Sequence, residues 1–315
     1  MKVAQLVKYG GTEAIVFNPN APPPTLTEGS ILVEVEAAGV NPFDWKMREG
    51  MMQKMIPLTF PVTAGADFSG VVSEVGGGVS NYKKGDEVYG QASILDGNSG
   101  AFAEMVVVGL NTIVHKPKSI THVEAAALPL VGVSAIQALI EHMKLTRGQR
   151  ILIHGGAGGI GSIAIQIGKH LGAYVVTTVS KEDAEYVKSL GADQTIDYKS
   201  EHFETILKDF DAVYDTVGGE INTRSYQVLK KGGILVSMLE QPKPELVKQY
   251  GITYIAQQTK VTSEKLTELA RLVDEKVIKV HVDKIFPLEK AGEALSYLED
   301  GLARGKVVVE IKKVQ

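Results

Sequence analysis

The segment Arg150-Ile-Leu-Ile-His-Gly-Gly-Ala-Gly-Gly-Ile-Gly161 decides the fold of this chain, because an apolar run leads directly into a glycine-rich turn. Gly156, Gly158 and Gly161 fit the G-x-G-x-x-G spacing, which combines a tight turn, close approach of backbone to phosphate and close packing of helix on strand. Apolar residues then recur at helical spacing, and Gly172 is suited to end the helix. The segment predicts a strand, a diphosphate-binding turn and a helix whose first amides face the anion. The residues expected at the diphosphate are Gly156, Ala157, Gly158, Gly159, Ile160 and Gly161.

Length and composition describe an ordinary globular protein. The 315 residues are 44% hydrophobic, which is enough for a large core and suggests two domains. The net charge is -4 and charges of both signs are interspersed, so nucleic acid is not expected as a partner. No apolar run reaches the roughly 18 to 20 residues that span a bilayer, and the first residues read as a strand rather than a secretion signal. We therefore expect a cytoplasmic protein without a membrane partner.

The chain contains no cysteine, which excludes disulfides, catalytic thiols and thiolate metal sites together. Its seven histidines also lack the close pairing of an imidazole zinc site. The sequence therefore predicts chemistry without a metal ion.

The order of elements predicts an α/β protein with two domains. Short strands bounded by turn signals are expected over residues 1–8, 31–39, 70–75, 87–90 and 103–108, which makes the first part β-rich. From about Thr121 helices and strands alternate, as in a parallel sheet covered on both faces. A helix is predicted over residues 123–143, followed by six strands near residues 151, 175, 194–197, 211–217, 234–238 and 252–257. The tail 305–311 is expected to rejoin the first sheet, giving domains of 1–121 with 263–315 and of 122–262.

Several separate motifs, in this order, resemble the medium-chain dehydrogenase/reductase superfamily. They are Gly39-Val-Asn-Pro-Phe-Asp44, Gly65-Ala-Asp-Phe-Ser-Gly70, Gly85-Asp-Glu-Val-Tyr-Gly90, Gly100-Ala-Phe-Ala-Glu104, Ala127-Leu-Pro-Leu-Val-Gly132, Tyr214-Asp-Thr-Val-Gly-Gly219 and Gly305-Lys-Val-Val308. The resemblance covers nearly the full length and implies a GroES-like catalytic domain joined to a Rossmann domain.

Within that superfamily the chain resembles the zinc-free quinone oxidoreductase branch. Alcohol dehydrogenases carry a cysteine ligand where this chain has Asn41 to Asp44, and Gly-His-Glu where it has Gly65-Ala66-Asp67. The resemblance therefore implies hydride transfer from a nicotinamide to a quinone or an activated enone without zinc, rather than oxidation of an alcohol.

The end of the second nucleotide-domain strand bears on the choice between NADPH and NADH. Ser180 and Lys181 stand where NAD-binding proteins usually place a carboxylate for the ribose, and a hydroxyl and an ammonium suit a 2′-phosphate. Tyr198 matches the family position that reaches the same phosphate. These residues favour NADPH, although Glu182 lies close to the spacing of a ribose-binding acid, which keeps NADH as the alternative.

Four residues are candidates for the reacting end. Asn41 and Asp44 match site positions of the family, Asn41 as a donor to a carbonyl oxygen and Asp44 as a pocket acid; the alternative for both is a role in an Asn-Pro turn. Trp45 and Met47 are candidates for the wall of an apolar slot, and core packing is the alternative use.

Further cofactor contacts are expected from Ser134, Val217, Ser237 and Met238. Ser134 matches a hydroxyl position near the nicotinamide carboxamide, and Ser237 and Met238 end the fifth strand, where open α/β sheets bind ligands. His154 is expected to pack inside the domain.

The leading hypothesis is an NADPH-dependent, metal-free reductase of quinones or related enones. An enoyl or 2-alkenal reductase on the same scaffold is the enzymatic alternative, and it needs a proton donor for the substrate α-carbon. A non-catalytic NADPH-binding redox sensor is the alternative of another class. The resemblance also implies a homodimer joined along the sheet edge near residues 252–257.

Overall fold

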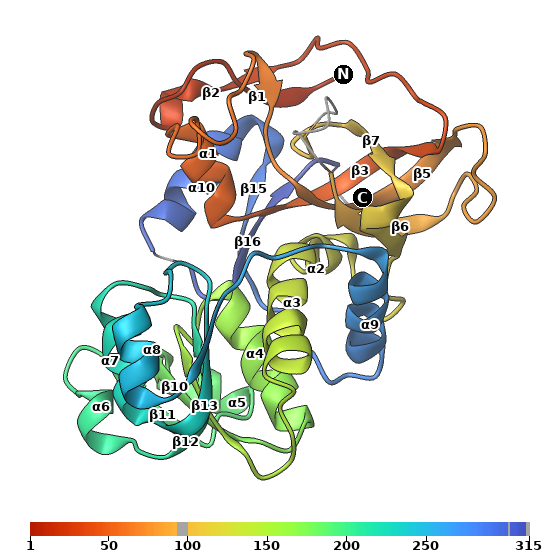
Figure 1. The fold of residues 1–315 in the computed structure, drawn as a ribbon. Coiled ribbons are helices and arrows are strands. Elements are labelled where there is room, and N and C mark those ends of the chain that lie inside the picture. Colours follow the sequence, from red (N-terminus) through yellow and green to blue (C-terminus); the bar gives the residue numbers. More distant parts are fainter. Residues whose placement is uncertain (93–99, 302, 313–315) are drawn as a thin grey trace. The chain divides into compact units, whose positions relative to one another are not determined.

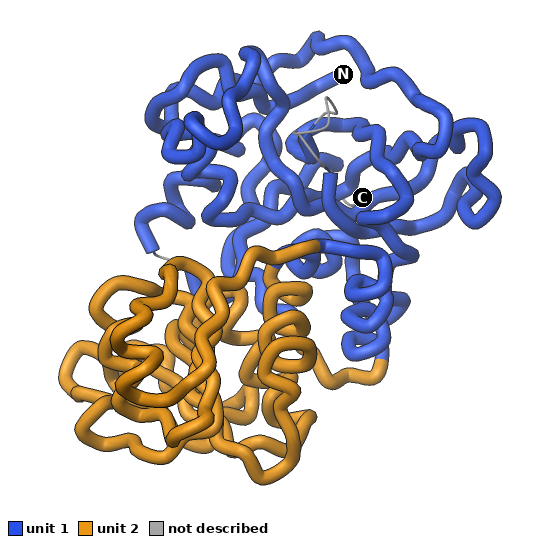
Figure 2. Tube along the Cα trace, viewed as in Figure 1, with its two compact units in different colours: residues 1–130, 261–274, 280–315 blue, residues 131–260, 275–279 orange. Residues whose placement is uncertain are grey.

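The computed structural model describes residues 1–92, 100–301 and 303–312 (Figure 1). The chain forms two units, coloured separately in Figure 2. Unit 1 comprises residues 1–130, 261–274 and 280–315, and unit 2 comprises residues 131–260 and 275–279. This is the α/β class that the sequence predicts, with a GroES-like domain and a parallel-sheet Rossmann domain.

The border between the units lies at residues 130 and 131 instead of 121 and 122. The helix predicted over 123–143 is broken into α2 (His122–Ala126), α3 (Pro129–Ile136) and a π-helical turn (Gln137–His142). Pro129 explains the break, because the residue before a proline is disfavoured in helical conformation. Helix α2 then packs on strands of unit 1 and is part of that unit.

Unit 1 is built around a seven-stranded sheet in the order β15-β16-β3-β5-β6-β8, with β7 paired to β3. A smaller sheet has the order β2-β1-β4. Strand β16 pairs antiparallel with β3, as the sequence predicts for the tail. The strands of unit 1 are β1 (Val3–Leu6), β2 (Ile15–Asn18), β3 (Ser30–Val40), β4 (Val62–Thr63), β5 (Asp67–Val75), β6 (Glu87–Gln91), β7 (Met105–Gly109), β8 (Ile113–His115), β15 (Val282–Pro287) and β16 (Lys306–Glu310).

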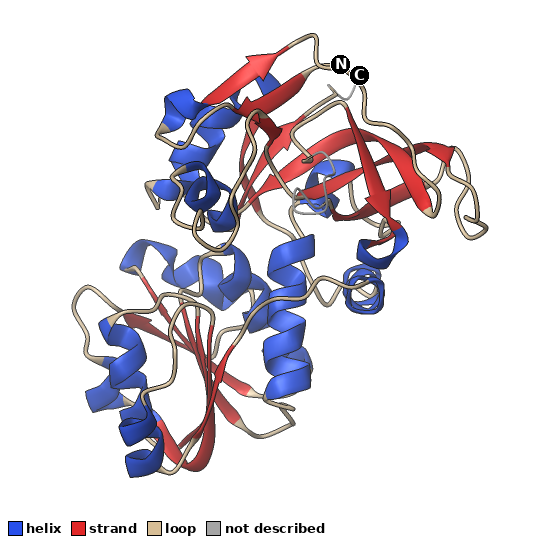
Figure 3. Ribbon diagram, turned by 45° about the horizontal axis from the view of Figure 1, so that its top comes forward, coloured by secondary structure: helices blue, strands red, loops and turns tan. Residues whose placement is uncertain are grey.

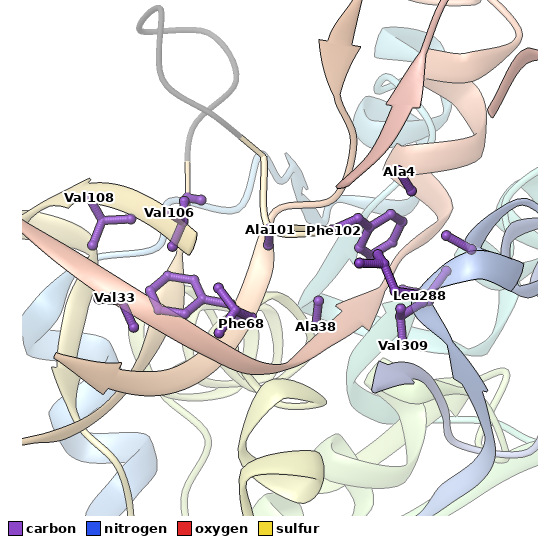
Figure 4. Packing of buried hydrophobic residues seen from close by; sticks show 14 of the residues in the cluster. Ala4, Val33, Ala38, Phe68, Ala101, Phe102, Val106, Val108, Leu288 and Val309 are labelled. Carbon is purple, nitrogen blue, oxygen red and sulfur yellow. The ribbon is translucent and has the colours of Figure 1, made fainter. Parts of the chain in front are cut away.

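The core of unit 1 lies between these strands and helix α10 (Ala291–Glu299). Phe68 and Phe102 are fully buried in it, beside small residues such as Ala38 and Ala101 (Figure 4). Helix α9 (Ser263–Asp274) also belongs to unit 1, since the Tyr89 hydroxyl donates to the Leu266 carbonyl at 2.6 Å.

Unit 2 contains a six-stranded parallel sheet in the order β11-β10-β9-β12-β13-β14, with helices on both faces (Figure 3). The order reverses between β9 and β12, which is where open α/β sheets bind ligands outside the carboxyl ends of the strands. The strands are β9 (Arg150–His154), β10 (Tyr174–Val179), β11 (Gln194–Asp197), β12 (Phe210–Asp215), β13 (Leu229–Ser237) and β14 (Thr253–Ala256). The helices besides α3 are α4 (Gly159–His170), α5 (Ala184–Ser189), α6 (Phe203–Ile206), α7 (Glu220–Ser225) and α8 (Pro244–Tyr250). Among the described residues, no helix combines the length and the apolar character needed to cross a bilayer.

Candidate active site

The glycine-rich turn of unit 2 joins β9 to α4, and its glycines differ in how much room each leaves for a side chain. A Cβ at Gly156 would lie 2.1 Å from the Thr177 hydroxyl oxygen, and a Cβ at Gly161 would lie 2.2 Å from the Gly155 carbonyl oxygen. Real side chains do not approach so closely, so the packing of the turn itself requires glycine at both positions.

Gly158 is free of that constraint. A Cβ there would meet nothing nearer than the Gly155 carbonyl oxygen at 3.4 Å. Gly158 is the N-cap of α4, a helix of twelve residues without an acidic residue in its first turn. The first amides of a helix have no partners within it and favour an anion. This turn therefore fits a dinucleotide diphosphate approaching Gly158 from its open side.

The ends of β10 and β11 form a mixed-charge edge. Ser180 and Tyr198 follow these neighbouring parallel strands, and the Tyr198 amide donates to the Val179 carbonyl at 3.2 Å. The Ser180 hydroxyl, however, donates to the Asp183 carboxylate at 3.0 Å. Tyr198 itself is 55% exposed.

Sequence reasoning did not identify Lys199. This residue brings a second ammonium close to this edge, in addition to that of Lys181. Its Nζ lies 3.4 Å from a Glu182 carboxylate oxygen. The signal in the sequence is its place directly after Tyr198. The edge thus offers cations for a 2′-phosphate together with the acid that an unphosphorylated ribose would use.

The loop after β12 is organised by Asp215, a fully buried carboxylate. Asp215 accepts hydrogen bonds from the Gly218 amide at 2.8 Å, from Asn222 Nδ2 at 2.7 Å and from the Ser237 hydroxyl at 2.9 Å. Val217 on the same loop is 45% exposed. Asp215 therefore shapes this loop and ties it to the end of β13.

Other predicted contacts of unit 2 lie in internal hydrogen-bond networks. Ser134 is fully buried, with its Oγ 2.6 Å from Thr259 Oγ1. The Met238 sulfur accepts from Gln257 Nε2 at 3.4 Å, and this amide also donates to the Ser134 carbonyl at 3.0 Å.

His154 packs inside unit 2, as expected. Its Nδ1 lies 3.0 Å from Thr178 Oγ1 and its Nε2 lies 2.9 Å from Ser225 Oγ. Burial lowers the pKa of His154 to about 4, so the imidazole is neutral at physiological pH. A neutral ring with both nitrogens engaged is a structural element of the sheet.

Asn41 and Asp44 lie at the start of α1 (Pro42–Arg48) in unit 1, beside two further charged residues, Asp67 and Lys306. The Asn41 amide N–H donates to the Asp44 carboxylate at 2.8 Å. The Asn41 side chain turns away from the helix: its Nδ2 donates to Asp67 at 2.9 Å, and its Oδ1 accepts from Lys306 Nζ at 2.5 Å. We refer to these four residues as the Asn41 cluster.

The Asn41 cluster is buried and extensively hydrogen-bonded. Asp67 also accepts from Gln91 Nε2 at 3.0 Å and from the Leu130 amide at 3.0 Å, and Lys306 donates to the Val40 carbonyl at 2.6 Å. Sequence reasoning did not assign roles to Asp67, Gln91 and Lys306. The available signal was a charged residue at the start of a strand, directly before apolar residues: Asp67 before Phe68 and Lys306 before Val307 to Val309.

Burial perturbs the ionisation of the cluster. The pKa of Asp44 is raised to about 7, mainly by loss of solvation; the hydrogen bond from the Asn41 backbone lowers it, Asp67 raises it and Lys306 lowers it. Loss of solvation also raises the pKa of Asp67 and lowers that of Lys306. Asp44 therefore holds a proton over part of the physiological pH range.

Trp45 and Met47 contribute to packing. Met47 is 3% exposed, and Trp45 lies partly buried against the core of unit 1. Within residues 1–92, 100–301 and 303–312, no three histidine, aspartate or glutamate side chains are arranged to hold a metal ion.

A dinucleotide-binding sheet and a GroES-like domain with a buried polar cluster define a class, the nicotinamide-dependent oxidoreductases of two-domain architecture. Comparison with known proteins agrees. Residues 27–118 match the family described as "Alcohol dehydrogenase GroES-like domain", and residues 190–309 match the one described as "Zinc-binding dehydrogenase". The second description mentions zinc, whereas this chain has no cysteine.

Individual relatives cover almost the whole chain. A Solanum lycopersicum protein named 2-methylene-furan-3-one reductase is 38% identical, covering 98% of this chain and 79% of its own. The quinone oxidoreductase structure from Coxiella burnetii has a TM-score of 0.92 at 34% identity and covers 99% of both chains. The Escherichia coli quinone oxidoreductase complexed with NADPH has a TM-score of 0.89 at 28% identity, covering 99% of this chain and 100% of its own. The chain belongs to the zinc-free quinone oxidoreductase branch of the medium-chain dehydrogenase/reductase superfamily, a family of NAD(P)H-dependent oxidoreductases.

Proposed function

We propose that this protein is an NADPH-dependent, metal-free reductase of small-molecule quinones or related enones. The observation that carries the proposal is the turn around Gly158, where the protein itself leaves open the side that a diphosphate would approach. The family supports hydride chemistry, and the absence of cysteine supports chemistry without a thiolate zinc site.

When bound, the nicotinamide would supply a hydride, which is two electrons and one proton. The Asn41 cluster of unit 1 is suited to supply the proton that completes the reduction, since the Asp44 carboxyl retains a proton near neutral pH. The side-chain amide of Asn41 has a second Nδ2 hydrogen besides the one donated to Asp67. This hydrogen suits Asn41 as a hydrogen-bond donor to the carbonyl oxygen of the quinone or enone. A quinone is already a strong electrophile, so positioning of the acceptor supplies much of the rate.

NADPH is proposed over NADH because of the cations near the ends of β10 and β11. Lys181 and Lys199 suit a doubly charged 2′-phosphate, and the hydroxyl of the exposed residue Tyr198 adds a donor. Glu182 opposes this preference because its carboxylate would repel the phosphate. The Escherichia coli structural relative is complexed with NADPH, which supports the same choice.

The experiment is to measure oxidation of NADPH and of NADH by the purified protein with a naphthoquinone and, separately, with an α,β-unsaturated aldehyde. A higher kcat/KM for NADPH with the quinone, unchanged by a zinc chelator, is the expected result. Oxidation of neither nucleotide with any acceptor, or turnover that requires added zinc, would overturn the proposal.

An enone or alkenal reductase on the same scaffold is the second candidate. The tomato relative is named for reduction of 2-methylene-furan-3-one, in which a methylene group is conjugated to a ring ketone. A carboxyl that carries a proton near neutrality, such as Asp44, supports this chemistry, because reduction of the carbon-carbon bond ends with protonation of the α-carbon. A higher kcat/KM for the aldehyde than for the quinone would select it. Tight NADPH binding with no turnover would instead favour a redox sensor.

A homodimer joined along β14 is part of the proposal. This strand is an edge of the parallel sheet of unit 2, and edge strands offer unpaired amides and carbonyls to a second copy. Sedimentation of the protein at micromolar concentration checks it, and a monomer under these conditions would contradict it.

A further inference from the structure

Lys306 is a buried ammonium that the proposed reaction does not explain. The residue is 5% exposed, and its Nζ donates to two uncharged acceptors, the Val40 carbonyl and Asn41 Oδ1. Burying an ammonium is costly unless charge and hydrogen bonds compensate for it. The main compensating charge is the Asp67 carboxylate, and Asp44 adds to it in its deprotonated form; both groups lie close enough to raise the pKa of Lys306 against the effect of burial.

Asp67 and Lys306 hold the two ends of the Asn41 side-chain amide. The ammonium contacts the amide oxygen and the carboxylate contacts the amide nitrogen, at 2.5 and 2.9 Å. A flipped amide would place its NH₂ group against the ammonium and its oxygen against the carboxylate. The two charges therefore allow only one orientation of Asn41.

The residues that hold Asn41 are carried by the sheet of unit 1. Lys306 begins β16, where the next residue, Val307, pairs with Val40 of β3, and Asp67 begins β5, where it pairs with Gly39. A Cβ at Gly39 would lie 2.2 Å from the Ala126 carbonyl oxygen, so α2 packs directly on this place. Side chains on strands are positioned more precisely than side chains on loops.

We propose that Lys306 and Asp67 are positioning residues, which act on the reaction through Asn41 by fixing the orientation of its side-chain amide. The inference rests on the proposed function. It predicts that loss of either charge lowers the rate of turnover while leaving the binding of the nucleotide by unit 2 unchanged.

The first test replaces the ammonium by an uncharged side chain of similar length, Lys306→Met. With NADPH and a naphthoquinone, kcat should fall between about tenfold and 100-fold, the range expected when a reacting group is misplaced. The KM for NADPH should stay the same. Lys116→Met is the matched control, because Lys116 Nζ is also buried, donates to the Ile120 carbonyl at 2.7 Å and lies 3.4 Å from Glu87. The control should keep the wild-type kcat.

The second test asks whether Lys306 acts through Asn41. The same substitution is made in an Asn41→Ala background, and kcat is measured by single turnover with excess enzyme. If Lys306 works by orienting the Asn41 amide, its replacement should have no further effect once that amide is gone. Equal losses in both backgrounds, or no loss in the wild-type background, would overturn the inference.

Removal of one charge alone can weaken folding, because it leaves its partner buried and uncompensated. The variant Lys306→Met/Asp67→Asn removes both charges and should recover the thermal stability lost in Lys306→Met. Its kcat should remain low because neither end of the amide is specified; a kcat that returns with the stability would overturn the inference. An inactive wild-type protein would contradict the proposed function, whereas an active wild type with unaffected variants contradicts only the positioning role.

Discussion

The two units build polar sites at strand ends in different ways. In unit 2 the turn from Gly155 to Gly161 is made of residues adjacent in the sequence, and it leaves main-chain amides for a ligand. In unit 1 the Asn41 cluster is made of polar and charged side chains up to 265 positions apart, and these groups bind mainly one another. The turn of unit 2 therefore leaves hydrogen-bond donors for a ligand, whereas the geometry of the Asn41 cluster is set by hydrogen bonds between its own side chains.

The largest expected effect tests the turn of unit 2. Gly161→Ala places a Cβ 2.2 Å from the Gly155 carbonyl oxygen, which is fixed backbone that cannot move aside without opening the turn. We expect a loss of about 4 to 5 kcal/mol in the free energy of unfolding of unit 2, near the upper limit for one substitution. Chemical denaturation and fluorescence titration with NADPH measure both consequences.

Gly158→Ala is the matched variant, because its Cβ would meet nothing nearer than 3.4 Å. Its stability should equal that of the wild type while its affinity for NADPH falls. If Gly158→Ala unfolds unit 2 as Gly161→Ala does, the distinction between packing glycine and ligand-facing glycine is wrong.

This difference also explains how much could be predicted from the sequence. The turn, the helix after it and the parallel strands of unit 2 follow from local patterns of glycine and apolar residues, and the structure confirms them. The tail strand was also predicted, because its apolar run has no helix after it.

Asn41 and Asp44 of the Asn41 cluster were predicted, but the addition of Asp67 and Lys306 could not be, since it depends on which strands become neighbours. Lys306 reaches Asn41 only because β16 pairs with β3, and Asp67 reaches it only because β5 pairs with the other edge of β3. The break in the helix predicted over 123–143 shows a smaller limit: Pro129 was visible, but the apolar pattern on either side of it favoured continuity.

Asp44 gives the next largest effect and concerns unit 1. Burial raises its pKa from the ordinary 3.8 to about 7, so between these values the folded chain holds a proton that the unfolded chain has released. The free energy of unfolding therefore decreases as pH rises from about 4 to 7, by about 4 kcal/mol. Asp44→Asn should remove this dependence. Hydrogen exchange of peptides from α1 and β3, corrected for intrinsic rates, measures it, and an unchanged pH dependence in the variant would contradict the assignment.

Two charged groups act on the pKa of Asp44: Asp67 of β5 raises it and Lys306 of β16 lowers it. Helix α10, which packs on α1, also carries a carboxylate, Glu299, but this group is paired with Arg48 at 2.6 Å. Asp67→Asn should therefore lower the pH at which Asp44 titrates and Lys306→Met should raise it.

His154 should give unit 2 the opposite dependence on pH. Burial lowers its pKa from 6.5 to about 4, so between these pH values the unfolded chain binds a proton on this imidazole and the folded chain does not. Its contribution to stability is present above pH 6.5 and is lost as pH falls toward 4, by about 3 kcal/mol. His154→Gln, which can keep hydrogen bonds to Thr178 and Ser225, should flatten the loss. Hydrogen exchange of peptides from β9 and β10 at pH 4.5 and 7 measures this loss. If the stability of both units changed with pH in the same direction, the predicted opposite dependence would be wrong.

The smallest expected effect lies at the exposed ends of β10 and β11, where ligand charge rather than packing decides. Lys199→Ala removes an ammonium that Glu182 now holds at 3.4 Å, and it should raise the KM for NADPH by about five- to tenfold while changing that for NADH little. Glu182→Gln should act in the opposite direction, because it removes a carboxylate near the 2′-phosphate. Lys188→Ala, which breaks a similar exposed pair with Glu185 at 2.9 Å, serves as the control and should alter neither constant. Equal changes for NADPH and NADH in the first two variants would mean that this edge binds the adenosine without reading its 2′ position, and cofactor choice would then have to come from elsewhere in unit 2.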